Sequence, residues 1–162
     1  MRAILQRVSH AAVDVDGVRV GEIGNGLLVL LGIGQGDGPD QIAQVTKKIL
    51  ELRIFDDENG KPNVSLIDCG GALLVVSQFT LYADTSRGRR PGYSAAAAPS
   101  VAEPLYEATV AVLRAAGVTV ATGVFGAEMQ VSLTNSGPYT IILDSDTLAY
   151  PAGIVPKADA GQ

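Results

Sequence analysis

Residues 14–20 read Asp14-Val15-Asp16-Gly17-Val18-Arg19-Val20 and carry the strongest short-range folding signal in the chain. Asp16-Gly17 separates two runs rich in β-branched residues. Both central residues of a two-residue hairpin turn need a positive φ, which this dipeptide tolerates. We therefore expect strands over Ala3–Val15 and Val18–Ile23, joined by a tight turn. A hairpin here favours a mixed sheet over a doubly wound parallel one.

Further strands follow from the apolar pattern. The continuous apolar run Leu27–Ile33 predicts a buried strand. Ala72–Leu81 predicts another, whose apolar run turns polar at Ser77-Gln78. Three short strands are expected near the end of the chain, over Val118–Thr122, Met129–Thr134 and Tyr139–Leu143. The polar segment Asn135–Thr140 is interpreted as a hairpin turn between the last two.

Two helices are expected between these strands. Pro39 suits the first position of a helix, with Asp37 or Gly38 as its cap. This helix has an apolar stripe at helical spacing, formed by Ile42, Val45, Ile49 and Leu52.

The second helix is expected to begin at a capping box over Ser100–Glu103, with Pro104 in its first turn. Gly117 is the expected stop. The predicted buried face consists of Leu105, Thr109, Val112 and Ala116. Thr85–Ala98 has no periodicity and is interpreted as a long ordered loop.

The chain has 162 residues, of which 47% are apolar and 18% charged, enough for a real core in one domain. We expect an α/β single domain over residues 1–146, with mixed, mostly antiparallel β-sheets and two main helices. Residues 147–162 lose periodicity and are predicted to form a flexible C-terminal tail.

Composition excludes several classes of function. A net charge of -5 argues against a protein that coats nucleic acid by bulk electrostatics, although a local contact patch stays open. One cysteine and one histidine exclude an internal disulfide and the common thiolate and multi-histidine zinc sites. No apolar run reaches the roughly 18 residues of a membrane span, so a soluble, cytoplasmic protein is expected.

The usual catalytic signatures are missing. The glycines of Gly32–Gly38 lack the spacing of a dinucleotide-binding loop, and no G-x-S-x-G elbow or evident carboxylate pair occurs. Cys69 and His10 could still meet in space as a thiol and its base. Otherwise an enzyme here must use a labile substrate, or backbone dipoles and groups on the substrate itself. A non-catalytic binding module is the remaining alternative.

Two motifs carry a family resemblance. Ser77-Gln78-Phe79-Thr80-Leu81 together with Asn135-Ser136-Gly137-Pro138 resembles the paired signature of the D-aminoacyl-tRNA deacylase family. The likeness extends over about residues 1–145. It includes further segments in family order: Gln6-Arg7-Val8, Gly88-Arg89-Arg90-Pro91, Leu105-Tyr106-Glu107 and the stretch from Gly126 through Met129 to Val131.

The resemblance implies a homodimer that hydrolyses the ester between a D-amino acid, or a mischarged glycine, and the terminal adenosine of tRNA. It implies no metal and no cofactor. Gly137-Pro138 would be cis and would enter the active site of the partner subunit, with Arg7 fixing its orientation. The Gly137 carbonyl would then accept from the substrate α-ammonium, and the rigid backbone would exclude an L side chain.

The expected chemistry follows from the missing acid–base pair. Backbone N–H groups near Phe79 and Thr80 are expected to stabilise the oxyanion, with the substrate 2′-hydroxyl assisting the attacking water. Thr80 is open to three roles, namely attack on the ester, positioning of water or shaping of the pocket, and positioning is favoured because no base is evident to activate its hydroxyl. The expected substrate-binding residues are Ser77, Gln78, Leu81, Met129, Gly137 and Pro138.

Two departures from the family pattern and one basic loop bear on the rim of the expected site. Tyr139 replaces a small aliphatic residue, and Gly92 stands where the family often has serine. Arg87, Arg89 and Arg90 cluster just beyond Ser77–Leu81 and are predicted to contact tRNA. Because only the acceptor end need be held, we expect a shallow salt dependence, of the order of two to four phosphate contacts.

Overall fold

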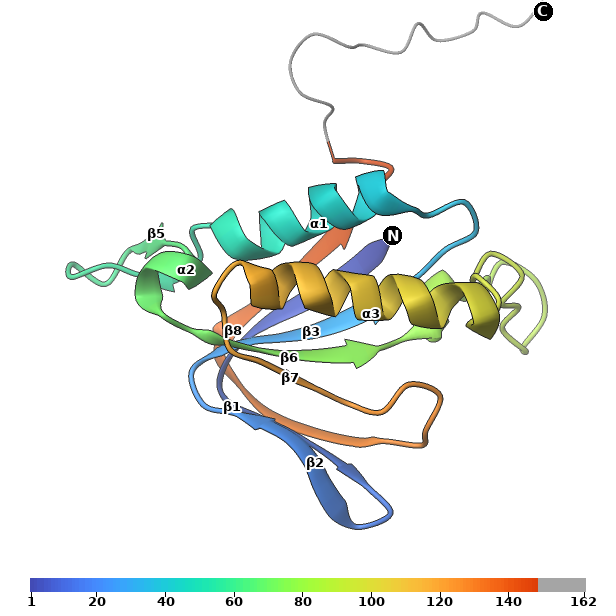
Figure 1. The fold of residues 1–162 in the computed structure, drawn as a ribbon, viewed down its shortest axis with the longest axis horizontal. Helices are drawn as coiled ribbons and strands as arrows, with labels where there is room; N and C mark the ends of the chain where they lie inside the picture. Colours follow the sequence, from blue (N-terminus) through green and yellow to red (C-terminus); the bar gives the residue numbers. More distant parts are fainter. Residues whose placement is uncertain (149–162) are drawn as a thin grey trace, which may run out of the picture.

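A computed structural model describes residues 1–148 (Figure 1). The strands are β1 (Arg2–Val15), β2 (Val18–Ile23), β3 (Gly26–Gly32), β4 (Phe55–Asp56), β5 (Pro62–Val64), β6 (Ala72–Ser77), β7 (Val120–Thr122) and β8 (Gln130–Asp144). The helices are α1 (Pro39–Glu51), α2 (Leu66–Cys69) and α3 (Pro99–Ala115), with a 3₁₀ turn η1 (Phe79–Tyr82). No helix in this part of the chain is long and apolar enough to cross a membrane.

The main sheet is mixed, as predicted. Its order is β2-β1-β3-β6-β7, and β8 also pairs with β1. β1 is antiparallel to β2, β3 and β8, whereas β3, β6 and β7 run parallel. The predicted β1–β2 hairpin is confirmed, with positive φ at both Asp16 and Gly17. β4 and β5 form a separate two-stranded ribbon.

The sheet has a buried core on each face, because alternate side chains of a strand point to opposite sides. Helices α1 and α3 cover one face, as Figure 1 shows, and Leu27, Val29, Leu73 and Val75 pack beneath them. The other face buries Leu28, Leu74 and Val76 against the second half of β1 and part of β8.

This second core exists because the sheet curls over. β2 approaches the far edge of the sheet so closely that a Cβ on Gly21 would lie 2.5 Å from the Thr122 carbonyl oxygen. Glycine is therefore required at this position, because any side chain there meets backbone.

The predicted hairpin over Asn135–Thr140 is wrong, because this segment lies within β8. The two expected strands are one continuous strand, and the polar segment is a bulge within it. Gln6 pairs with Thr140 and Val8 with Asn135, so two steps along β1 span five steps along β8. Residues 136–139 are thus displaced from the ladder, opposite Arg7. We call Ser136–Tyr139 the bulge.

The first helix follows the prediction, and the second departs from it. α1 begins at Pro39 with Gly38 as its cap, and the Gln41 side chain accepts from the Gly38 N–H at 2.9 Å. α3 begins at Pro99 rather than at a Ser100 capping box, because Pro99 itself occupies the first helical position. Pro104 consequently lies inside the helix rather than in its first turn.

The buried face of α3 also differs from the predicted one. It consists of Ala102, Tyr106, Thr109, Val110 and Leu113. Val112, expected to be buried, is 43% exposed. The Tyr106 hydroxyl donates to the Val75 carbonyl at 2.8 Å, which gives this polar tip a partner inside the core. Burial raises the pKa of Tyr106 to about 12.

Two boundaries in the second half of the chain matter for the site. The predicted strand over Ala72–Leu81 ends at Ser77, and the chain turns into η1. Of the tail predicted over residues 147–162, the first two residues form a turn on Asp144, and Leu148 packs against the helix-side core. Residues 149–162 of that predicted tail lie outside the described residues.

Candidate functional site

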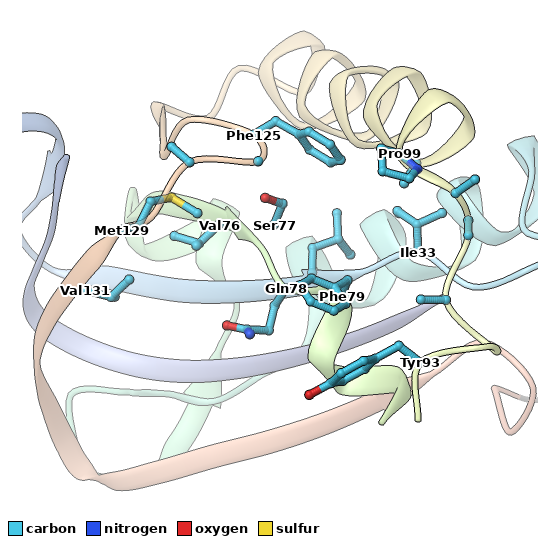
Figure 2. A pocket seen from close by; sticks show the side chains of 17 residues that line it. Ile33, Val76, Ser77, Gln78, Phe79, Tyr93, Pro99, Phe125, Met129 and Val131 are labelled. Carbon is cyan, nitrogen blue, oxygen red and sulfur yellow. The ribbon is translucent and has the colours of Figure 1, made fainter. Parts of the chain in front are cut away.

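An apolar cavity of about 630 Å³ opens between the N-terminal end of α3 and the sheet. Four segments line it: the end of β3, the β6–η1 junction, residues 93–102 and residues 125–131. Figure 2 shows Phe125 and Pro99 on one side, with Gln78, Phe79 and Tyr93 facing them and Met129 beside Val76. Tyr93 is the one titratable side chain among the lining residues, all of which belong to the described part of the chain.

The wall of this cavity is Ser77–Tyr82, where β6 passes into η1. The Gln78 N–H donates to the Leu31 carbonyl at 2.8 Å, which is the last backbone bond between this segment and β3. The Gln78 side-chain amide donates to the Thr80 hydroxyl oxygen. That contact occupies an acceptor position of Thr80 and leaves its proton free to be donated.

Two backbone donors of the wall have no partner. Within residues 1–148, neither the Phe79 N–H nor the Thr80 N–H donates a hydrogen bond to the protein. This is expected at the start of a 3₁₀ turn, whose first N–H groups have no carbonyl behind them. The two donors are therefore available to an oxygen atom at the wall.

Arg2 contacts the wall at Leu81 and Tyr82. Its guanidinium donates to the Leu81 carbonyl at 3.1 Å and to the Asp144 carboxylate at 2.8 Å. It also lies 4.6 Å from the centroid of the Tyr82 ring. Tyr82 in turn covers Gly34 so closely that a Cβ on Gly34 would lie 2.6 Å from the ring.

The bulge on β8 is held by a second arginine. Arg7 Nε donates to the Ser136 carbonyl at 3.0 Å, and Nη1 donates to the Ile54 carbonyl at 2.8 Å and to Asp56 at 3.1 Å. The same guanidinium lies over the Tyr139 ring, with its Cζ 4.8 Å from the ring centroid. Arg7 is only 12% exposed.

The tip of the bulge points to solvent. The Gly137–Pro138 peptide bond is cis, Gly137 has φ +136°, and both residues are exposed. The Asn135 side-chain oxygen accepts from the Tyr139 N–H at 2.8 Å, and its amide donates to Thr140 at 2.9 Å. The bulge is thus tied at its base and free at its tip.

The structure brings together some predicted site residues and separates others. Ser77, Gln78, Phe79 and Met129 line the cavity, and Thr80 and Leu81 belong to its wall without lining it. Arg7, Gly137 and Pro138 do not line it. A small cavity of about 140 Å³ beside Arg7 and Ser136 is separate. Arg87, Arg89 and Arg90 are exposed on the loop beyond the wall.

The thiol hypothesis finds no support in the geometry. Cys69 is exposed at the end of α2 and donates to the Leu66 carbonyl, while His10 contacts Glu22 at 2.7 Å. Neither residue lines the cavity. Within residues 1–148, no group of three or more His, Cys, Asp or Glu side chains is arranged to hold a metal ion.

The sequence did not single out several residues of the candidate site. Tyr93 and Phe125 line the cavity, but each lies in a segment without periodicity, so no pattern marked them. Asp56 and Ile54 contact Arg7 across 47 or more positions in the chain. Tyr139 alone gave a signal, as a departure from the family pattern beside a site motif.

Comparisons with known proteins bear on the identity of this site. Residues 4–144 match the protein family described as D-Tyr-tRNA(Tyr) deacylase. A D-aminoacyl-tRNA deacylase from Chloroflexus aurantiacus is 54% identical over 160 residues, covering 99% of this chain and 100% of the relative. Another, from Chromobacterium violaceum, is 59% identical over 146 residues, covering 90% and 97%.

Solved structures of similar proteins have the same fold as this chain. The c-Myc DNA unwinding element binding protein superposes with a TM-score of 0.84 at 39% identity, covering 89% of this chain and 98% of that one. A probable eukaryotic D-amino acid tRNA deacylase shares the fold, with a TM-score of 0.76 at 21% identity over 88% and 97% of the two chains. The chain therefore belongs to the D-aminoacyl-tRNA deacylase family of ester hydrolases.

Proposed function

We propose that this protein removes D-amino acids, and glycine from mischarged tRNA, by hydrolysing their ester bond to the terminal adenosine of tRNA. It acts as a homodimer in the cytoplasm, without metal or cofactor. Each active site combines the cavity of one subunit with the Gly137-Pro138 tip of the other.

The observation that carries the proposal is the division of the two motifs within one chain. Ser77–Phe79 line a cavity large enough for a small ligand, whereas Gly137 and Pro138 lie outside it on an exposed bulge. An exposed tip that is anchored at its base and lies outside the large cavity of its own chain is suited to fill the site of another subunit. A two-fold dimer supplies this exchange twice.

The reaction needs few protein side chains. The adenosine enters the cavity, and the ester carbonyl oxygen accepts from the Phe79 and Thr80 N–H groups. Water attacks the carbonyl carbon, negative charge collects on that oxygen, and the bond to the adenosine oxygen then breaks. The departing oxygen takes the proton that water loses, with the neighbouring 2′-hydroxyl assisting the transfer. The products are a free amino acid and tRNA with a free end.

Thr80 positions water in this scheme rather than attacking the ester. Its hydroxyl oxygen accepts from Gln78, and no histidine, lysine or carboxylate among the lining residues is present to remove its proton. The free hydroxyl proton of Thr80 can be donated to the water or to the carbonyl. The same lack of a side-chain base is the reason for assigning proton transfer to the substrate.

Chirality is read by the backbone at the tip. The Gly137 carbonyl accepts from the substrate α-ammonium, while the wall holds the ester carbonyl. Two of the four bonds at the α-carbon then have fixed directions. The remaining space beside the tip takes a hydrogen but not a side chain. L-amino acids are then rejected by collision, and glycine is accepted because it has no side chain to exclude.

The first test offers D-tyrosyl-, L-tyrosyl- and glycyl-tRNA to the purified protein and measures the release of each amino acid. We expect release of D-tyrosine and glycine, with L-tyrosine retained. Equal release of D- and L-tyrosine, or none of either, would contradict the proposal.

The second test asks whether one site needs two subunits. Gly137→Ala disables the tip and Gln78→Ala the wall, and each homodimer is expected to be weakly active. Random mixing makes half of the dimers mixed, each with one intact site, so about a quarter of the wild-type activity should return. No recovery in dimers shown to be mixed would mean that the tip and the wall act within one chain.

A further inference from the structure

Two aromatic side chains at the mouth of the cavity have no role in the mechanism above. Phe79 contributes its N–H to the wall, but the residue is 57% exposed, and Tyr93 is 40% exposed. The rings contact each other edge to face, with centroids 5.0 Å apart and an angle of 68° between their planes. Both line the cavity and lie together on one side of it in Figure 2.

The segment that carries Tyr93 is held firmly. We call Gly92–Ala97 the strap. At its start, Gly92 and Asp84 exchange two backbone hydrogen bonds of 2.7 and 2.9 Å. Further along, the Gln35 N–H donates to the Ala95 carbonyl at 3.0 Å, and the Ala97 N–H donates to the Ile33 carbonyl at 3.0 Å. Tyr93 is therefore presented on a fixed backbone.

The two bonds between Asp84 and Gly92 also close the base of residues 85–91, which we call the arginine loop. Every arginine outside this loop has a partner: Arg2, Arg7 and Arg19 form ion pairs, and Arg53 and Arg114 donate to backbone carbonyls. Within residues 1–148, Arg87, Arg89 and Arg90 form neither an ion pair nor a side-chain hydrogen bond. Three unneutralised cations thus lie in the loop that leads directly into the strap, in an otherwise acidic protein.

The side of the cavity mouth near Val131, away from Phe79 and Tyr93 in Figure 2, has no such group of unpaired arginines among the described residues. Val131 is exposed there, beside Glu128 and Gln130. Asp14 pairs with Gln130, and its carboxylate is bound by Arg19. A polyanion leaving the cavity is therefore favoured on the Phe79–Tyr93 side, which leads to the unpaired arginines.

We propose that Phe79 and Tyr93 form a stacking platform for the unpaired base that precedes the terminal nucleoside of the tRNA acceptor end. The loop arginines contact the phosphates beyond that base. This inference rests on the proposed function, since it assumes that the terminal nucleoside occupies the cavity.

The chemistry of the surface fits a single-stranded nucleic acid. Exposed aromatic rings beside arginines are the usual way to hold unpaired bases, since every base has a face that stacks. The cavity holds one nucleoside with its amino acid, so the next nucleotide must lie outside, at the mouth. Tyr93 stays partly exposed beside this edge-to-face contact, so part of its side chain is available to a base.

The test uses two non-hydrolysable probes in which an amide replaces the ester. Both carry D-tyrosine on the adenosine of a dinucleotide. One has cytidine before the adenosine, and the other has an abasic ribose there with the same phosphate. Dissociation constants are measured by calorimetry for the wild type, Tyr93→Leu and Tyr93→Phe. Stacking of one base predicts that the wild type binds the abasic probe about 5- to 150-fold more weakly.

The ratio between the two probes decides the matter. In Tyr93→Leu it should fall close to one, and in Tyr93→Phe it should stay near the wild-type value. If Tyr93 only lines the cavity, both probes weaken equally in Tyr93→Leu and the wild-type ratio survives, which overturns the inference. Equal binding of both probes by the wild type also overturns it.

Failure of this inference and failure of the proposed function are separable in the same preparation. Release of D-tyrosine by the wild type together with a probe ratio of one removes the platform alone. No release of D-tyrosine removes the proposed function, whatever the ratio.

Discussion

The cavity wall and the β8 bulge use their polar groups in opposite ways. In the wall, the Phe79 and Thr80 N–H groups have no hydrogen-bond partner within residues 1–148. In the bulge, the Ser136 carbonyl and the Asn135 side chain are bonded within the chain, and Arg7 is held on several sides. The wall therefore keeps two donors free for a ligand, whereas the base of the bulge is held by bonds within the chain.

The strongest way to test this difference is to remove Arg7. Arg7→Ala should lower kcat/KM for D-tyrosyl-tRNA by about 100-fold, because the tip loses its anchor and small misplacements are costly. Loss of hydrogen bonds to a charged group should also cost about 2–3 kcal/mol in the free energy of unfolding. Ester hydrolysis and urea unfolding measure the two effects.

Arg53→Ala is the matched control, since Arg53 also donates to a backbone carbonyl, but on the surface near β5. It should leave hydrolysis close to the wild-type rate. Comparable losses of activity in the two variants would show that Arg7 has no special connection with the tip.

Gly137→Ala tests the tip itself and should have the next largest effect. Its φ of +136° is unfavourable for alanine, and the new Cβ would lie 3.1 Å from the Tyr139 nitrogen and 3.3 Å from an Arg7 nitrogen. The strain is about 1–3 kcal/mol, which the exposed tip relieves by moving. Hydrolysis of D-tyrosyl-tRNA should fall at least about 10-fold with the thermal unfolding temperature nearly unchanged. Wild-type activity in this variant would argue against the proposed chiral filter.

Arg2→Ala addresses the wall instead. The Leu81 carbonyl and Asp144 lose their common donor, so η1 is less firmly placed. We expect about a 10-fold loss in kcat with little change in KM, because the cavity itself stays intact. Single-turnover and steady-state kinetics separate these quantities. A rise in KM alone would assign Arg2 to binding.

Tyr139→Leu should have a smaller effect than either arginine change. It removes the ring that packs on Arg7, a contact worth about 0.5–2 kcal/mol, but leaves the three hydrogen bonds of Arg7. Tyr139→Phe keeps the ring and is the control. Equal unfolding free energies in the two variants would show that the stacking contributes nothing.

The smallest expected change is in the salt dependence of tRNA binding. The wild type should show a slope of about two to four phosphate contacts, and Arg89→Ala should lower it by about one. Titrations at several salt concentrations measure the slope. A slope as steep as that of a groove-coating protein would contradict a contact limited to the acceptor end.

Local signals in the sequence predicted the parts of the fold that depend on local geometry. Asp16-Gly17 predicted the first hairpin because the turn itself demands those residue types. Pro39 marked the start of α1 for a similar reason. The Ser77–Leu81 motif located the cavity wall, although the apolar pattern did not reveal that the strand ends at Ser77.

Local sequence signals could not predict the bulge. Polar residues around Gly137-Pro138 give the same signal whether the chain reverses or only leaves the ladder. What decides between them is the pairing of both flanks with β1, a strand more than 100 residues earlier in the chain. Tyr93 could not be predicted for a related reason, since most of the bonds that fix the strap come from Ile33, Gln35 and Asp84, outside the strap.

The position of the bulge inside one uninterrupted strand bears on how this enzyme can change through mutation. Both flanks are paired with β1, so the length of the projection is fixed. In the mechanism proposed above, the chiral filter is the backbone at Gly137, which has no side chain to lose. That mechanism predicts that tolerance of L-amino acids is accessible through changes at very few positions, with Gly137, Pro138 and Arg7 foremost among them.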